Sequence, residues 1–218
     1  MTPTIDWALS LLREAHGPLA ERPHLSPVAE LIQTILSQNT SDLNSSRAYS
    51  NLASHYPTWK DVAMAEEHEI AESIRSGGLA RIKSSRIKLI LNKIMQERAD
   101  MDLNFLRELP LDEAKAWLRQ LPGIGPKTAA CVLLFSLDMP AMPVDTHVFR
   151  LARRLGLVAD GISVEGAHEA LESLLGPEQV YPFHMYLIQH GRRVCKAGKP
   201  LCHRCVLVER CPSVFNQS

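Results

Sequence analysis

Four cysteines near the end of the chain have the spacing of a metal-binding loop. Cys195, Cys202, Cys205 and Cys211 form the pattern C-x6-C-x2-C-x5-C, and only Cys131 lies elsewhere. Four thiolates can hold either a structural zinc ion or an iron–sulfur cluster. A disulfide framework is disfavoured, because the first 17 residues lack the basic and apolar stretches of a signal peptide and we expect a cytosolic protein.

A glycine turn between two predicted helices is the second candidate site. Residues 121–129 read LPGIGPKTA, in which Gly123, Ile124 and Gly125 form the turn. The glycines let the backbone approach a partner closely, and the next helix begins with unpaired N–H groups at the positive end of its dipole. These groups can bind a DNA phosphate without reading a base. The alternative is an ordinary helical hairpin with a glycine turn.

Lys127 follows this turn directly and is a candidate nucleophile. The helix dipole disfavours its ammonium form, and a neutral amine can form a Schiff base with a sugar. Taken alone, Lys127 could equally be a solvated surface lysine. Asp145 lies at the predicted start of another helix, where a carboxylate is a good N-cap.

The elements that position these residues are predicted to be helices. Apolar residues recur with helical spacing at positions 28, 31, 32, 35 and 36, and again from Ile87 to Met95. No pair of strands or hairpin turn stands out. We therefore predict an all-α fold. The predicted helices include 44–55, 66–76, 81–98, 112–120, 126–137 and 180–190.

Length and composition fit a globular protein of two lobes. The chain has 218 residues, of which 45% are hydrophobic, and it has 24 basic and 24 acidic residues. This balance excludes a uniformly basic coat for nucleic acid. No apolar run approaches the roughly 18 residues of a membrane span. The stretch 138–143 predicts a crossing between two lobes, 20–138 and 1–19 with 139–218.

Basic residues nevertheless gather in two stretches of the chain. Residues 75–98 contain seven basic residues and one acid, and residues 192–210 contain six basic residues and one acid. These stretches would be either two surfaces that hold a polyanion or two solvated helical faces.

The glycine turn and the segment around Asp145 together resemble a known family. LPGIGPKTA is similar to the helix–hairpin–helix signature of the endonuclease III group of DNA glycosylases. Residues 143–150, PVDTHVFR, resemble the VDTHxxR element of that group, and the resemblance extends from about Ser26 to Cys211. It implies a two-lobed helix–hairpin–helix DNA glycosylase fold. The lobe 20–138 would be a six-helix barrel, and the other lobe would carry an iron–sulfur cluster.

The resemblance also implies an activity, a cofactor and a partner. Lys127 would be the Schiff-base nucleophile of a glycosylase and β-elimination lyase acting on oxidised or damaged pyrimidines, and Asp145 would stabilise positive charge on the sugar. The cysteine spacing matches the [4Fe–4S] loop of the family. The implied partner is double-stranded DNA with a damaged base or an abasic site. The protein would act as a monomer in a bacterial or archaeal cytoplasm, at the nucleoid.

A first segment implied to open the duplex is LSQNTSD at 36–42. It resembles the family pattern LSxQxxD, and gapless matching places Asn39, not Gln38, at the glutamine position. This departure leaves either Gln38 or Asn39 to fill the space of an extruded nucleotide.

A second such segment contains Gly78 and Leu79. It resembles the Gly-Leu wedge of the family, with Leu79 as the intercalating side chain, although a core contact after a helix end would also explain a leucine there. Lys83 and Arg86 follow, and we expect both to touch phosphates.

Two other functions fit part of this pattern. A monofunctional glycosylase of the same superfamily would remove a mispaired base, but such relatives commonly have serine or tyrosine in place of Lys127. A non-catalytic helix–hairpin–helix module would use the hairpin and the metal loop only to bind DNA. The presence of Lys127, Asp145 and a full-length barrel favours an enzyme.

Overall fold

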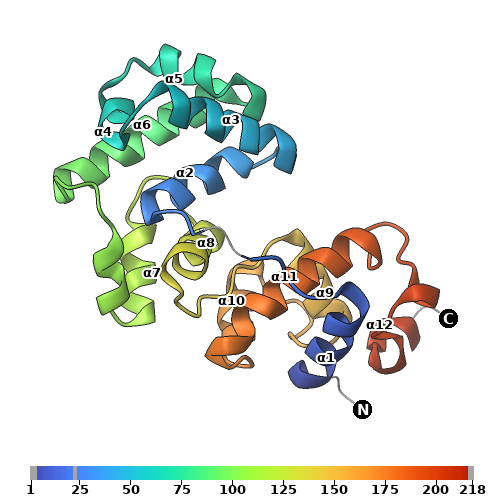
Figure 1. Ribbon diagram of the computed structural model, residues 1–218. Helices are drawn as coiled ribbons and strands as arrows, with labels where there is room; N and C mark the ends of the chain where they lie inside the picture. Colours follow the sequence, from blue (N-terminus) through green and yellow to red (C-terminus); the bar gives the residue numbers. More distant parts are fainter. Residues whose placement is uncertain (1–3, 22–23, 216–218) are drawn as a thin grey trace. The chain divides into compact units, whose positions relative to one another are not determined.

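A computed structural model describes residues 4–21 and 24–215, and the regular structure in these ranges is entirely helical (Figure 1). The predicted all-α fold is therefore confirmed. In the described ranges, no helix is both long and apolar enough to span a membrane. The elements are α1 (Ile5–His16), α2 (Pro27–Ser37), α3 (Asp42–His55), α4 (Trp59–Met64), α5 (Glu67–Ser73), η1 (Arg75–Gly77), α6 (Ala80–Glu97), η2 (Asn104–Glu108), α7 (Leu111–Arg119), α8 (Pro126–Leu137), α9 (Thr146–Arg154), α10 (Val164–Glu172), α11 (Pro177–Arg193), η3 (Cys202–Arg204), η4 (Val208–Arg210) and α12 (Pro212–Phe215).

The chain divides into two compact units. Unit 1 combines the chain up to Arg22 with the chain from Pro140 onward, and unit 2 is Pro23–Met139. The two lobes expected from the sequence have boundaries within three residues of these divisions.

Unit 2 is built around α8. Nine of the twelve residues of α8 are buried, as expected for a helix that is apolar on all sides. Helix α2 packs along α8 and buries eight of its eleven residues. Helix α7 and η2 also contact α8, while α3, α4 and α6 pack on their neighbours in the same unit. The glycine turn therefore lies between α7 and an interior helix.

Unit 1 is organised by α11, which packs against α1 and α9. The Tyr186 hydroxyl of α11 donates a hydrogen bond to the carbonyl of Gly17 after α1, at 3.0 Å. This contact ties the beginning of the chain to its C-terminal part. The segment after α11 contains the four clustered cysteines and forms the short turns η3 and η4.

Two predicted helices differ from the observed elements. The helix predicted at 66–76 is divided, because α5 ends at Ser73 and a separate 3₁₀ turn leads to Gly77. The helix predicted at 180–190 runs from Pro177 to Arg193. Its start is set by Pro177 at the first helical position, where the missing N–H group has no cost.

Candidate functional site

The turn between α7 and α8 has the geometry of a helix–hairpin–helix motif. Gly123 has φ +73°, a conformation that side chains other than glycine rarely adopt. The Ile124 N–H donates to the Leu121 carbonyl at 3.1 Å, and the Ile124 side chain is buried. Gly125 is the N-cap of α8, and no side chain in the described ranges caps this helix end. The first N–H groups of α8 are therefore available to an anion.

Lys127 is the second residue of α8 and is half-buried. The residues that follow it, from Thr128 to Leu134, are all buried. Lys127 therefore stands where an interior helix comes to the surface, directly beside the hairpin turn. The structure brings the predicted nucleophile and the predicted phosphate-binding backbone together on one short segment.

Asp145, in unit 1, is the N-cap of α9. Its Oδ1 atom accepts hydrogen bonds from the backbone N–H groups of His147 and Val148, both at 2.8 Å. The predicted capping role is therefore confirmed. Oδ2 takes no part in this cap, and Asp145 is only half-buried. The fixed carboxylate thus keeps an oxygen that a substrate could use.

Helix α9 also connects Asp145 to the cysteine loop within unit 1. The guanidinium of Arg150 donates from Nε to the Cys195 carbonyl and from one terminal nitrogen to the Gly191 carbonyl, both at 3.0 Å. Arg150 lies five residues after Asp145. No role was predicted for Arg150 from its residue type, although its place in the element PVDTHVFR was a signal.

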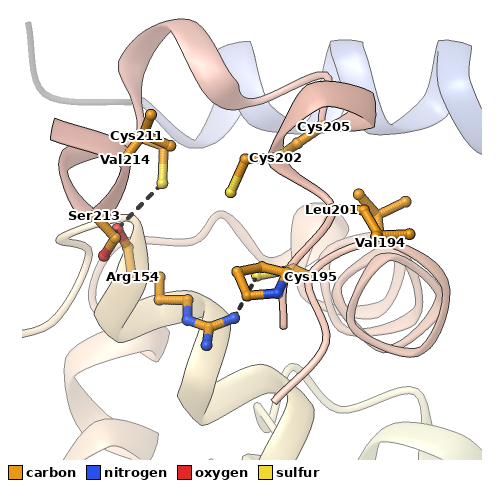
Figure 2. Close-up of a pocket in the computed structure, with 10 residues that line it drawn as sticks. Arg154, Val194, Cys195, Leu201, Cys202, Cys205, Cys211, Ser213 and Val214 are labelled. Carbon is orange, nitrogen blue, oxygen red and sulfur yellow. Dashed lines mark hydrogen bonds between the residues drawn. The ribbon is translucent and has the colours of Figure 1, made fainter. Parts of the chain in front are cut away.

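The four clustered cysteines line one pocket, together with Arg154 and apolar residues (Figure 2). All four are free thiols in the structure, so a disulfide framework has no support. Burial is the main reason why the pKa of the Cys205 thiol is raised to about 11, and the neighbouring cysteines raise it further. Such a thiol stays protonated at neutral pH unless a metal takes the place of the proton.

The pocket suits soft-metal chemistry, since thiolates select zinc or iron–sulfur clusters. Within residues 4–21 and 24–215, no three His, Cys, Asp or Glu side chains gather closely enough to hold one metal ion. The four sulfur donors line one pocket, and four thiolates can hold either a zinc ion or an iron–sulfur cluster.

Two side chains make hydrogen bonds to the cysteine sulfurs. Arg154 donates to Cys195 Sγ at 3.2 Å, and Figure 2 shows its guanidinium reaching this sulfur. His190 is buried, and its Nε2 lies 3.3 Å from Cys205 Sγ, while its Nδ1 lies 3.0 Å from Nε2 of His16. Burial, with a smaller effect of His16, lowers the pKa of His190 to about 4. A neutral His190 can therefore donate its single N–H to a thiolate.

The loop after α2 separates its two candidate residues. Gln38 is half-buried, and its Oε1 accepts a hydrogen bond from Arg86 at 2.9 Å. Asn39 is exposed and has φ +54°. Leu79, at the start of α6, has φ +51° and is 52% exposed. Leu79 is therefore not a core residue, which removes the alternative considered for it.

Lys83 is buried and hydrogen-bonded within the protein, which contradicts the expectation that it touches DNA phosphates. Its side chain is 3% exposed, and its Nζ donates to the carbonyls of Leu36 at 2.7 Å and Gly77 at 2.8 Å. Burial lowers the pKa of the amine. Because it lies on the inner face of α6, Lys83 fastens the end of α2 to the turn before Leu79. Lys83 therefore supports the loop after α2 and the turn before Leu79.

The basic stretch 75–98 is for the most part engaged within the protein. Lys88 donates to the Ala65 carbonyl at 2.6 Å, and Lys93 pairs with Glu97 at 2.7 Å. Arg75 lies 3.8 Å from Glu72. The expectation that this stretch holds a polyanion stays a prediction, and these contacts show which of its basic residues already have partners within the protein.

Comparison with known proteins identifies a family and a fold. The profile of the "HhH-GPD superfamily base excision DNA repair protein" matches residues 32–177. Endonuclease III of Thermotoga maritima is 36% identical over 186 residues, which are 85% of this chain and 82% of that protein. An Arabidopsis thaliana protein named as a candidate DNA glycosylase is 39% identical over 181 residues, 83% of this chain but only 61% of that protein.

A solved structure agrees with these sequence relationships. It is a trapped covalent intermediate of endonuclease III with DNA, and it matches with a TM-score of 0.82 and 28% sequence identity. The match covers 98% of this chain and 96% of that chain.

Proposed function

This chain belongs to the endonuclease III family of base excision repair DNA glycosylases, and we propose that it is a bifunctional glycosylase and abasic-site lyase for damaged pyrimidines. The observation that carries the proposal is Lys127, half-buried at the uncapped start of α8 and next to the hairpin turn. A phosphate bound by the N–H groups there would bring the neighbouring sugar within reach of an amine.

Lys127 would supply the nucleophile. Its neutral amine attacks C1′ of the damaged nucleotide, and the bond from C1′ to the base breaks, so that the base leaves with the electron pair and takes up a proton. Loss of a proton from the bound amine and opening of the sugar ring give a Schiff base. Removal of a C2′ proton then expels the 3′ phosphate by β-elimination.

Asp145 would provide negative charge and a proton acceptor. Its Oδ1 is fixed by two backbone N–H groups, so the carboxylate keeps one orientation. Oδ2 would remain to stabilise positive charge on the sugar as the base leaves and to accept a proton during the reaction.

Cys195, Cys202, Cys205 and Cys211 would hold a [4Fe–4S] cluster. Support comes from their common pocket, their free thiols and the family to which the chain belongs. When bound, such a cluster supplies a rigid cross-link between cysteines and a centre for one-electron transfer. Arg154 and His190 would donate hydrogen bonds to its thiolates. The proposed partner is double-stranded DNA with a damaged base or an abasic site, bound by a monomer.

Borohydride trapping tests the role of Lys127. We would compare the wild type with Lys127→Ala on one duplex with thymine glycol and one with a preformed abasic site. We expect the wild type to be trapped on both and the variant on neither. Lys60→Ala removes an exposed lysine of α4 and should trap like the wild type. If Lys127→Ala still cleaves the abasic duplex at the wild-type rate, the proposal is overturned. Base release without trapping would indicate a monofunctional glycosylase.

Asp145→Asn separates the catalytic charge from the cap. Asparagine is as good an N-cap as aspartate, so we expect an unchanged melting temperature. Because the negative charge is lost, base excision should fall by roughly 100-fold or more. Unchanged excision together with unchanged stability would leave Asp145 with the structural role alone.

A further inference from the structure

Arg86 of α6 contacts two segments that are distant in sequence from it and from each other. Its guanidinium donates to Oε1 of Gln38 at 2.9 Å, in the loop after α2. The same side chain covers Gly123 of the hairpin turn. A Cβ atom placed on Gly123 would lie 3.1 Å from Nε of Arg86 and 3.5 Å from Cδ and Cζ. Glycine at 123 is thus favoured by its φ of +73°, and a side chain there would also press on the arginine packed against it.

The loop that Arg86 holds has a conformation that needs support. Asn39, directly after Gln38, is exposed in the left-handed region, with φ +54°. Asparagine adopts this region more readily than other residues with a side chain, and contacts from neighbouring elements favour it further. Arg86 and Lys83 supply such contacts one turn apart on α6. Lys83 fixes the Leu36 carbonyl, and Arg86 fixes the Gln38 amide.

We propose that Arg86 is a positioning residue that couples the helix–hairpin–helix turn to the loop carrying Gln38 and Asn39. The inference rests on the proposed function, in which the hairpin binds a phosphate and the loop enters the duplex. Because the Arg86 side chain both packs on the turn and holds the loop, it links phosphate binding by the turn to entry of the loop into the duplex. In this role the Arg86 guanidinium contacts protein and leaves the phosphates to the backbone of the turn.

A double-mutant cycle with Gln38 tests the coupling. We would measure binding of Arg86→Met, Gln38→Ala and the double variant to a duplex with an uncleavable abasic-site analogue, and excision of thymine glycol from a duplex. Each single variant should lose roughly 10-fold or more in excision, the size typical of a lost hydrogen bond to a charged group. The double variant should lose little more than either single variant, because both remove the same interaction. Additive losses would overturn the proposal.

The salt dependence of binding distinguishes positioning from direct phosphate contact. A residue that neutralises one phosphate contributes about 0.9 to the slope of log K against log salt concentration. Arg86→Met should leave this slope unchanged, while a decrease of about 0.9 would show that Arg86 binds the DNA. Arg81→Met is the charge-matched comparison, because Arg81 is exposed and lines the same groove beside the turn. Arg81→Met should reduce excision and binding of the abasic-analogue duplex by the same factor. Arg86→Met should reduce excision and binding by different factors.

A third comparison uses a substrate that needs no opening. Cleavage of a single-stranded oligonucleotide with a preformed abasic site should stay within about twofold of wild type in Arg86→Met, because no base pair has to be broken. Equal losses on this substrate and on the duplex would overturn the proposal. Arg86→Lys keeps the charge but not the planar fork and should behave like Arg86→Met. Melting temperatures of all variants check folding.

The design keeps this proposal separate from the proposed function. If the wild type is never trapped on DNA, the proposed lysine chemistry fails, whereas the cycle can still be read from the binding of the abasic-analogue duplex. If the wild type is trapped but Arg86 and Gln38 act additively, the proposed chemistry stands and the coupling fails.

Discussion

The interior of unit 2 and the cysteine segment of unit 1 are stabilised in different ways. Around α2 and α8, most residues are buried, and the aliphatic side chains in this buried set are 0–5% exposed. In the cysteine segment, residues 194–211, only Leu207 and Cys211 are buried. This segment forms two short 3₁₀ turns, and the side chains of Arg150 and Arg154 hold its carbonyls.

The difference shows which interactions each region needs. Burial of apolar surface stabilises the interior of unit 2 at about 25 cal/mol per Å², and it requires no cofactor. A loop of eighteen residues with two buried side chains cannot offset its conformational entropy in this way. We infer that the cysteine segment depends on the proposed cluster for its stability, as small metal-binding domains depend on their metal. Substitutions in the two regions should therefore have separable effects.

Removal of one proposed cluster ligand should have the largest effect. Cys202→Ala should abolish iron binding, because a cluster held by three thiolates is easily lost. Structural metal sites contribute roughly 10 kcal/mol or more in small domains, so the cysteine segment should unfold and become sensitive to protease. Iron content, visible absorbance and limited proteolysis would report this result. Cys131→Ala, in buried α8, is the matched control and should retain iron. Full iron content in Cys202→Ala would refute the assignment.

A substitution in the core of unit 2 should lower the stability of that unit without loss of iron, in contrast to Cys202→Ala. Leu31 of α2 is fully buried, so Leu31→Ala should lower the free energy of unfolding by about 2–5 kcal/mol. Iron content per folded molecule should not change. Leu43→Ala, in which the leucine is 69% exposed, should cost less than about 0.5 kcal/mol. Chemical denaturation followed by circular dichroism and by absorbance would separate the two regions. If iron is lost at the same denaturant concentration at which the circular dichroism signal is lost, the two regions unfold together.

The sequence was informative where one residue type or one spacing dictates the structure. The period of apolar residues predicted α2 and α6, the helix predicted at 126–137 is α8, and Asp145 was recognised as an N-cap. Lys83 was misassigned because a lysine in a basic stretch is usually solvated. Its burial depends on two carbonyls, of Leu36 and Gly77, that the fold brings to it. No local pattern in the sequence records such an encounter.

The same reason explains why the supporting arginines and histidine were not found. Arg86 was expected to touch phosphates, while its observed contacts lie 48 residues upstream at Gln38 and at Gly123. His190 meets His16 across 174 residues. Contacts of this kind depend on how helices pack, whereas candidate nucleophiles and metal ligands are marked by residue type and spacing alone.

Arg154 should have an intermediate effect that is confined to the cysteine segment. It donates to Cys195 Sγ and to the carbonyls of Lys196 and Ala197. Arg154→Met removes these charged hydrogen bonds, and we expect a loss of about 1.5–3 kcal/mol in the stability of the segment. Faster release of iron to a chelator would measure it. Arg153→Met changes the exposed neighbouring arginine and should release iron at the wild-type rate. Equal rates in the two variants would mean that the contacts contribute nothing.

Substitution of Leu79 should change stability least, and any change should be an increase, whereas most substitutions lower stability. Its φ of +51° costs a leucine on the order of 1 kcal/mol, and its side chain is 52% exposed. Leu79→Gly removes this strain, so the free energy of unfolding should be unchanged or rise by up to about 1 kcal/mol. Excision from a base-paired duplex should nevertheless fall, because the proposed wedge is lost.

Leu89→Gly is the same substitution inside the same helix, at a leucine that is 55% exposed. There glycine should lower the free energy of unfolding by about 1 kcal/mol, since it replaces a good helix former. Opposite signs for the two variants would show that the rigid interior of unit 2 maintains a strained apolar residue at its surface for use on DNA. A loss of stability in Leu79→Gly as large as that in Leu89→Gly would show instead that Leu79 serves the fold, and the wedge assignment would lose its physical basis.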